Sequence, residues 1–331
     1  MNFTSVVEHL PANETQLFEL ALKIQAVLAL TIPPVLLTGI STYGSVAGQT
    51  KGRSLIPNVN GALSWYIMEL TVLISFWYGV LIPLDFSWSQ VFSPAAEDTA
   101  LPVWHVHLAN VVLQQVQNLP ITTWVFIGMF LLHYANRALI YPFRSRKRAS
   151  MPLHVLAAGI TFNIINGYTN GRGLTTFSEC ASECASKDLT WWWIGHPARF
   201  AHVEGFLLFF AGFIGNIMSD NAFLNLRERA IAAKKQSADS NGAKNDKSES
   251  QSHYVIPTGF FLFNFVSSPH YLCELLEWFG FAMATGSTAG WLFVALTAAN
   301  LVPRAIRSHQ WYKERFPNYP QERRAIIPFV L

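Results

Sequence analysis

Long apolar runs constrain this chain more than any other feature, because each of them is long enough to cross a lipid bilayer. A transmembrane helix needs about 20 predominantly apolar residues. Seven stretches approach or exceed that length: 16–40, 61–83, 107–141, 152–171, 197–224, 256–286 and 288–306. Only 13% of the residues are charged, about half the usual share in a soluble domain. Since backbone groups in lipid must bond internally, the pattern predicts an all-α membrane protein, a seven-transmembrane-helix bundle.

The basic residues predict the orientation of this bundle. Eighteen of the 23 lysines and arginines lie in four connections, 41–60, 142–151, 225–253 and 304–331, whereas the other connections hold mainly acidic residues. Cytosolic loops carry the excess of Lys and Arg. We therefore expect a lumenal N-terminus and a cytosolic C-terminus, which agrees with an odd number of spans. With no cleavable signal pattern at the N-terminus, the first span reads as an anchor in a multi-pass protein of the endoplasmic reticulum membrane.

The chain is predicted to form one transmembrane domain, 1–331. Residues 233–253 are polar and low in complexity, which favours a flexible cytosolic loop within it. A net charge of +3 gives no indication of nucleic-acid binding, and no obligatory protein partner is evident. The three cysteines carry no zinc signature. No Rossmann fingerprint is present, so a dinucleotide would have to bind inside the helix bundle.

Ionisable side chains inside the spans are the candidate functional residues, because each costs several kcal/mol unless it is paired or faces a cavity. Trp65 and Glu69 are four residues apart and share a helix face. An apolar setting favours the neutral form of Glu69, which can donate a hydrogen bond to a carbonyl. Tyr134, Arg137 and Tyr141 share another face. The alternatives are interhelical hydrogen bonds and, for the tyrosines, an interfacial aromatic belt.

Further polar stripes lie toward the basic, cytosolic ends of the spans. They comprise Asn216, Asp220 and Arg227, then His270, Glu274 and Glu277, and finally Arg304 and Arg307. Together with Arg146 and Arg148 they would suit a cofactor with several phosphates, because arginine binds two oxygens at once. The alternatives are snorkelling of arginines to the interface and contact with anionic lipid heads.

The C-terminal half carries an ordered set of motifs that resembles the steroid 5α-reductase (3-oxo-5α-steroid 4-dehydrogenase) family. The motifs are Tyr254-Val-Ile-Pro257, Ser268-Pro269-His270 through Glu274, Glu277 and Trp278, and the ending that contains Arg304, Tyr312, Tyr319-Pro320 and Pro328-Phe329. His133-Tyr134 with Arg137, Asn166-Gly167 and Asn216-Ile-Met-Ser-Asp220 match as well. The resemblance covers roughly residues 40–331.

The resemblance implies an NADPH-dependent oxidoreductase that acts on CH–CH groups of a lipid or steroid substrate. Hydride would reach the β-carbon of an α,β-unsaturated ketone, such as a 4-en-3-one steroid or a similar polycyclic lipid. Glu69 and Tyr134 would be the catalytic pair that polarises the ketone, and Trp65 would line the substrate pocket. The residues implied as cofactor contacts are Arg146, Arg148, Asn216, Asp220, Arg227, Tyr254, His270, Glu274, Arg304 and Tyr312.

Three alternatives remain at the level of sequence. A trans-2-enoyl-CoA reductase or a polyprenol reductase would belong to the same superfamily, although the Glu69–Tyr134 pair favours a ketone. A seven-span receptor or transporter would not explain why the polar stripes match a reductase in order. The exact substrate, the proton donor to the α-carbon and the oligomeric state stay open.

Overall fold

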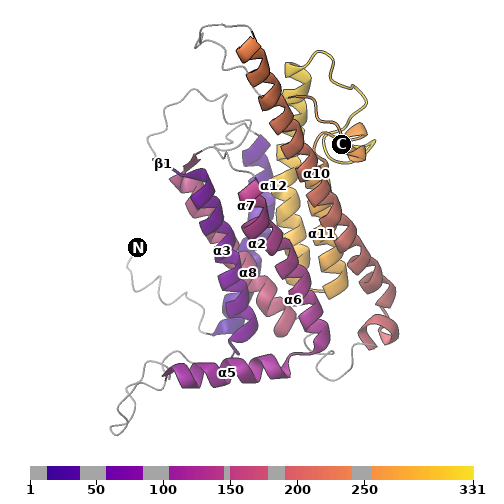
Figure 1. Cartoon of the computed structure of the whole chain (residues 1–331). Helices are drawn as coiled ribbons and strands as arrows, with labels where there is room; N and C mark the ends of the chain where they lie inside the picture. The colour runs from indigo at the N-terminus through magenta and orange to yellow at the C-terminus, as the bar shows by residue number, and fades with distance from the viewer. Residues whose placement is uncertain (1–12, 38–56, 85–103, 145–149, 178–190, 241–254) are drawn as a thin grey trace.

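The computed structural model describes residues 13–37, 57–84, 104–144, 150–177, 191–240 and 255–331. Within these ranges the chain is almost entirely helical, and its long helices run side by side as a bundle (Figure 1). The helices are α2 (Glu14–Leu37), α3 (Gly61–Leu81), α5 (Trp104–Asn118), α6 (Ile121–Tyr134), α7 (Tyr141–Arg144), α8 (Leu153–Thr175), α10 (Arg199–Ser240), α11 (Pro269–Thr285) and α12 (Thr288–Arg315). Four of them, α2, α3, α10 and α12, are long and apolar enough to cross a membrane.

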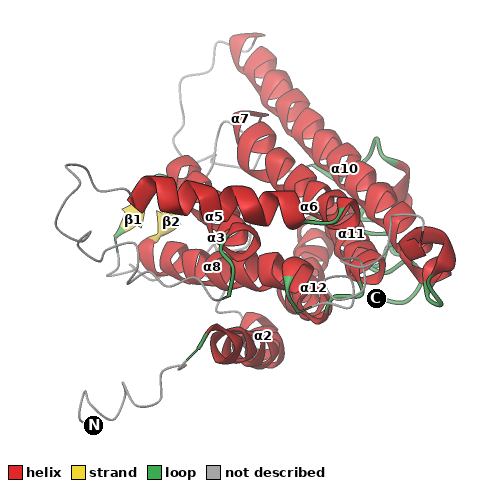
Figure 2. Cartoon of the chain, turned by 90° about the horizontal axis from the view of Figure 1, so that it is seen from below, coloured by secondary structure: helices red, strands yellow, loops and turns green. Residues whose placement is uncertain are grey.

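The predicted span 107–141 is wrong as one continuous helix. The structure breaks it after Asn118, and the two parts, Leu108–Asn118 and Ile121–Arg144, are bent by 106°. Pro120 stands at the N-cap of α6, where its missing N–H costs no helical hydrogen bond. Viewed along the bundle, α5 lies crosswise at one end, where it contacts α3 (Figure 2). Counting this bent pair as one span gives five candidates by length and composition.

The predicted span 256–286 is also corrected, because only its second half is helical. Residues 255–268 hold one short 3₁₀ turn, η4 (Phe261–Asn264), and α11 starts at Pro269. Proline suits the first turn of a helix, and Gly286 ends α11 in the left-handed conformation that glycine tolerates. Conversely, α10 continues to Ser240, so the first residues of the predicted 233–253 loop are helical. Residues 241–253 lie outside the described ranges.

Close helix pairs make up most of the bundle. α3 packs along α8, and α10 packs along α11. A methyl group added at Gly167 of α8 would overlap the backbone of α3, and one at Gly212 of α10 would overlap the backbone of α11. Small residues therefore let these backbones approach, as they do in membrane helix packing generally.

One end of the bundle gathers the described ends of the four basic connections. The two-stranded sheet of β1 (Asn58–Val59) and β2 (Met151–Pro152), the end of α7, the end of α10 and the C-terminus all lie there, opposite α5 (Figure 1). The C-terminal segment returns to the bundle beside the start of α11, where Ser267 N donates to Arg324 O at 2.8 Å. We call this the basic end.

Candidate functional site

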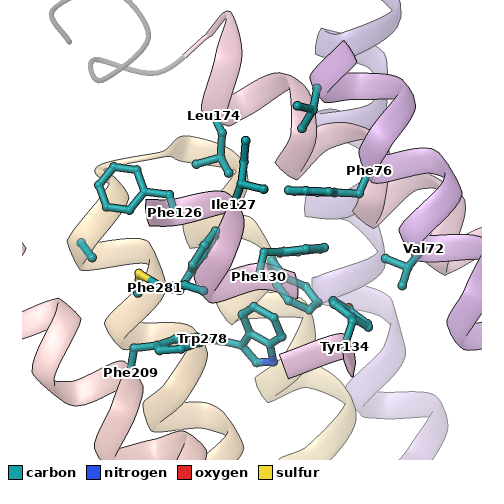
Figure 3. Close-up of a cluster of buried hydrophobic side chains, with 14 residues drawn as sticks. Val72, Phe76, Phe126, Ile127, Phe130, Tyr134, Leu174, Phe209, Trp278 and Phe281 are labelled. Carbon is teal, nitrogen blue, oxygen red and sulfur yellow. The ribbon is translucent and has the colours of Figure 1, made fainter. Parts of the chain in front are cut away.

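Tyr134 ends α6 inside an aromatic core formed by α3, α6, α11 and α12. Its ring lies 4.7 Å from Phe130 and 6.0 Å from Trp278, centroid to centroid, and only 4% of the residue is exposed (Figure 3). Phe130 in turn stacks on Phe76 of α3 at 4.1 Å. These packed rings exclude water from around the phenol and give it one fixed position.

The phenolic oxygen of Tyr134 meets a polar stripe on α8. Asn166 Nδ2 donates to Tyr134 Oη at 3.1 Å. One turn later, Asn170 Nδ2 donates to Asn166 Oδ1 at 2.9 Å and to the Asn166 carbonyl oxygen at 3.0 Å. Both asparagines are buried. Asn166 was part of the sequence resemblance without a role, and the structure places it in direct contact with the predicted catalytic tyrosine.

Glu69 and Trp65 lie on α3, as their spacing predicts. Glu69 is 7% exposed, and its helix contacts both α6 and η2 (Ala135–Ile140), the turn that follows Tyr134. Trp65 donates from its indole nitrogen to the Arg137 carbonyl oxygen at 3.1 Å. The structure therefore buries both predicted catalytic residues on neighbouring helices, and it bonds Trp65 to the turn that follows Tyr134.

Arg137 contacts side chains from three different helices in this region, although the sequence suggested no specific role for it. It belongs to η2 (Ala135–Ile140), a π-helical turn between α6 and α7, and such turns are frequent at functional sites. Its guanidinium lies 3.5 Å from Asp220 of α10, 3.9 Å from Glu274 of α11, and 5.3 Å from the centre of the Trp65 ring. Two predicted cofactor residues thus share one cation.

A second ion-pair geometry lies beside Tyr134. His133 Nδ1 is 2.8 Å from Glu277 Oε1, and both side chains are buried. The His133 ring also packs on Trp278 at 4.4 Å. The pair ties α6 to α11 across 144 positions of sequence, a separation that spacing rules cannot bridge.

Of the remaining predicted cofactor residues, some are buried or hydrogen-bonded, one is exposed, and three lie outside the described ranges. Asn216 Nδ2 donates to the His270 carbonyl oxygen at 2.9 Å, and Arg304 Nε donates to Asn300 Oδ1 at 2.9 Å. Tyr312 is buried and stacks on Tyr319 with the ring centres 5.4 Å apart. Arg227 lies further along α10 and is exposed, whereas Asn216 and Asp220 on the same helix are buried. The residues Arg146, Arg148 and Tyr254 lie outside the described ranges.

Beyond Tyr312, the basic end holds a polar cluster that the sequence did not predict. Ser267 Oγ is 2.6 Å from His309 Nδ1 and 2.7 Å from Tyr319 Oη. It fixes the C-terminal segment against α11 and α12. In the described part of the chain, no group of three or more His, Cys, Asp or Glu side chains could hold a metal ion.

Comparisons with known proteins point in one direction. Residues 149–331 match the family model described as 3-oxo-5-alpha-steroid 4-dehydrogenase. The chain is 32% identical over 291 residues to 3-oxo-5-alpha-steroid 4-dehydrogenase 1 of Mus musculus, with 88% of each chain covered. It is 34% identical over 211 residues to steroid 5-alpha-reductase DET2 of Solanum lycopersicum, covering 62% of this chain and 69% of that one. An uncharacterised protein of Schizosaccharomyces pombe is 31% identical over 315 residues, covering 94% of this chain and 98% of that one.

Proposed function

Because this chain belongs to the 3-oxo-5-alpha-steroid 4-dehydrogenase family, we propose that it reduces the carbon–carbon double bond of an α,β-unsaturated ketone. The substrate is a 4-en-3-one steroid or a similar polycyclic lipid, and the reductant is NADPH. The observation that carries the proposal is the burial of Glu69 and Tyr134 on two helices that contact each other, α3 and α6.

Tyr134 and Glu69 act on the oxygen of the substrate ketone. When the β-carbon gains a hydride, negative charge develops on that oxygen and an enolate forms. A phenol and a neutral carboxylic acid each donate a hydrogen bond to it. Donors that are already oriented in a dry site contribute about 10²–10³ in rate each. The aromatic core around Tyr134 supplies the dry surroundings.

The residues toward the basic end fit a dinucleotide by their chemistry. They offer amide, imidazole, carboxylate and guanidinium groups from three helices: Asn216 and Asp220, His270 and Glu274, and Arg304. One buried atom in this set is unsatisfied, because His270 Nδ1 has no hydrogen-bond partner among the described residues. A buried polar atom without a partner costs free energy, which a ligand would recover. When bound, NADPH supplies the hydride.

Arg137 holds two of these proposed cofactor residues, Asp220 and Glu274, in a fixed arrangement. Without it, the buried Asp220 and the partly buried Glu274 would repel each other with no cation between them. Its contacts reach α10 and α11 as well as Trp65 on α3. It therefore connects the proposed cofactor residues, Asp220 and Glu274, to the proposed substrate residue Trp65. Arg146, Arg148, Tyr254 and Arg227 complete the proposal as contacts with the phosphates and adenosine.

The bundle completes seven spans if α8 and α11 cross the membrane as well. Both lie inside the bundle beside the candidate spans (Figure 1), and the buried asparagines of α8 lower its apolar character. The basic end then faces the cytosol, the N-terminus is lumenal, and the membrane is that of the endoplasmic reticulum. This orientation lets NADPH enter from the cytosol and a lipid substrate from the bilayer.

The proposal is tested by following NADPH absorbance with purified protein. We expect oxidation with a 4-en-3-one steroid and none with the matching saturated ketone. A trans-2-enoyl-CoA substrate serves as the competing class. Turnover of the enoyl-CoA alone would replace the substrate assignment, and absence of both turnover and NADPH binding would refute the enzyme reading.

A further inference from the structure

The amide directions of Asn166 and Asn170 follow from one contact with the backbone. Asn170 Nδ2 lies 3.0 Å from the carbonyl oxygen of Asn166, and a carbonyl oxygen only accepts. The group facing it must therefore be the NH₂ of Asn170. The same nitrogen lies 2.9 Å from Asn166 Oδ1, which consequently accepts its second hydrogen.

The direction of Asn170 fixes the direction of Asn166 in turn. Because Oδ1 of Asn166 faces Asn170, its NH₂ faces Tyr134 Oη at 3.1 Å. The phenolic oxygen thus accepts a hydrogen bond from Asn166, and its own O–H remains available to donate to another group. If the amide were reversed, its oxygen would attract the phenolic proton and turn it away from a substrate.

We propose that Asn166 is a positioning residue that acts through Tyr134, with Asn170 holding its amide in the productive direction. All the donors then run one way, from Asn170 to Asn166, from Asn166 to Tyr134, and from Tyr134 to the substrate oxygen. A hydroxyl that accepts one hydrogen bond becomes a stronger donor in the next, because successive bonds polarise each other. The inference rests on the proposed role of Tyr134.

α8 also offers a matched comparison one turn earlier. Asn163 is buried like Asn166, and its Nδ2 donates to the Met68 carbonyl oxygen of α3 at 2.6 Å. That bond joins two helices without touching the tyrosine. If the α8 asparagines only held the bundle together, replacing Asn163 and replacing Asn166 would have similar consequences.

The test compares Asn166→Leu with Asn163→Leu in the full-length protein. We expect Asn166→Leu to lower kcat by about tenfold, the equivalent of one net hydrogen bond, with KM for the steroid and NADPH affinity nearly unchanged. Asn163→Leu lowers the unfolding temperature and keeps most of the kcat of the folded protein. Asn170→Ala, which leaves Asn166 in place but unfixed, gives a smaller loss of kcat and serves if Asn166→Leu does not fold.

A double-mutant cycle with Tyr134→Phe separates the outcomes. In the Tyr134→Phe background, residual turnover of a radiolabelled steroid should be the same with and without Asn166→Leu, because the bond acts only through the hydroxyl. Equal proportional losses in both backgrounds would overturn the proposal. So would normal kcat in both Asn166→Leu and Asn170→Ala. If Tyr134→Phe itself were fully active, the proposed function would fail first, so the two failures are distinguishable.

Discussion

The proposed roles of Glu69 and Tyr134 as hydrogen-bond donors can be tested separately, because substitutions can remove or keep the donor at each position. Glu69→Gln keeps an N–H donor, so it should retain part of the activity, whereas Glu69→Ala should nearly abolish it. Tyr134→Phe keeps the ring that packs on Phe130 and Trp278 and loses the hydroxyl, so kcat should fall about 10²–10³-fold. Steady-state kinetics with separate measurement of NADPH affinity checks this. Normal turnover of Tyr134→Phe would contradict the assignment.

Replacing Arg137 should lower the stability of the folded protein more directly than it lowers the rate of the chemical step. Arg137→Gln leaves the buried Asp220 and the partly buried Glu274 without their shared cation, and removing one partner of a buried ion pair costs about 3–5 kcal/mol. We expect a lower unfolding temperature in detergent and weaker NADPH binding. Adding Asp220→Asn to Arg137→Gln should recover part of the loss, because one unpaired charge disappears.

The exposed Arg227 gives the control for the unfolding temperature, measured without NADPH, and not for NADPH binding. Arg227→Gln should leave the unfolding temperature unchanged. An equal shift in both variants would show that the cost is loss of positive charge alone and does not depend on the buried contacts of Arg137.

Residue chemistry could be predicted from sequence where an ionisable group interrupts an apolar run. Glu69, Asp220 and Glu274 stand out for that reason, and the structure buries them or pairs them. The partners could not be predicted, since Arg137 meets Asp220 across 83 positions. Asn166 was noted only as part of a matching motif, without a role, and asparagines are common in interhelical contacts. Its role depends on which atom faces the phenol, and that is a property of three-dimensional geometry.

At the scale of elements, the contact between α10 and α11 should tolerate very little added volume. Gly212→Ala would place a methyl group against the backbone nitrogen of Glu277, so the helices must separate and the wall that carries Asp220 and Glu274 must shift. We expect a lower unfolding temperature and weaker NADPH binding. Gly128→Ala on α6 is the matched control, because nothing lies within 4 Å of the added methyl and alanine favours the helix.

Hydropathy predicted the helices whose apolar runs are uninterrupted. It failed where a break in the helix or a backbone contact with another segment determines the local structure. α2, α3 and α12 begin and end within a few residues of their predictions or extend beyond them. The break at Pro120 was missed because the residues before it, Gln114, Gln115, Gln117 and Asn118, are polar but uncharged, so the apolar residues on either side were joined into one span. Residues 255–268 are apolar too, yet their backbone groups bond to the C-terminal segment, as when Arg324 N donates to Phe265 O.

The whole molecule has two ends with different surroundings if the proposed orientation holds. Thr258 lies in the segment that leads to α11 at the basic end, whereas Ala198 directly precedes α10, whose start lies at the opposite end (Figure 1), and both residues are exposed. In a background with the three native cysteines replaced, Thr258→Cys should react with an impermeant maleimide in intact microsomes. Ala198→Cys should react only after permeabilisation. The opposite pattern would invert the topology and place the cofactor residues on the lumenal side.

The first candidate span, α2, is held to the rest of the molecule by an ion pair with the buried Arg172 of α8. Arg172 of α8 is fully buried, and its Nε donates to Glu14 Oε1 of α2 at 2.8 Å, while Tyr168 donates to the same oxygen at 3.2 Å. The acid also stands in the first turn of α2, where the helix dipole favours negative charge. Arg172 Nη1 reaches the Ile82 carbonyl oxygen after α3, so one guanidinium joins three helices.

Removing this acid should therefore release α2 from the bundle. Glu14→Ala leaves Arg172 buried without its counter-ion and should cost about 3–5 kcal/mol, seen as a lower unfolding temperature. The same helix offers its own control, because Glu19 pairs with Lys23 at 3.8 Å on an exposed face, where such pairs contribute about 0.3–0.5 kcal/mol. Glu19→Ala should unfold almost like the unaltered protein. Equal shifts would mean that α2 is held by its apolar contacts with α12 and α8, and that the ion pair adds nothing beyond them.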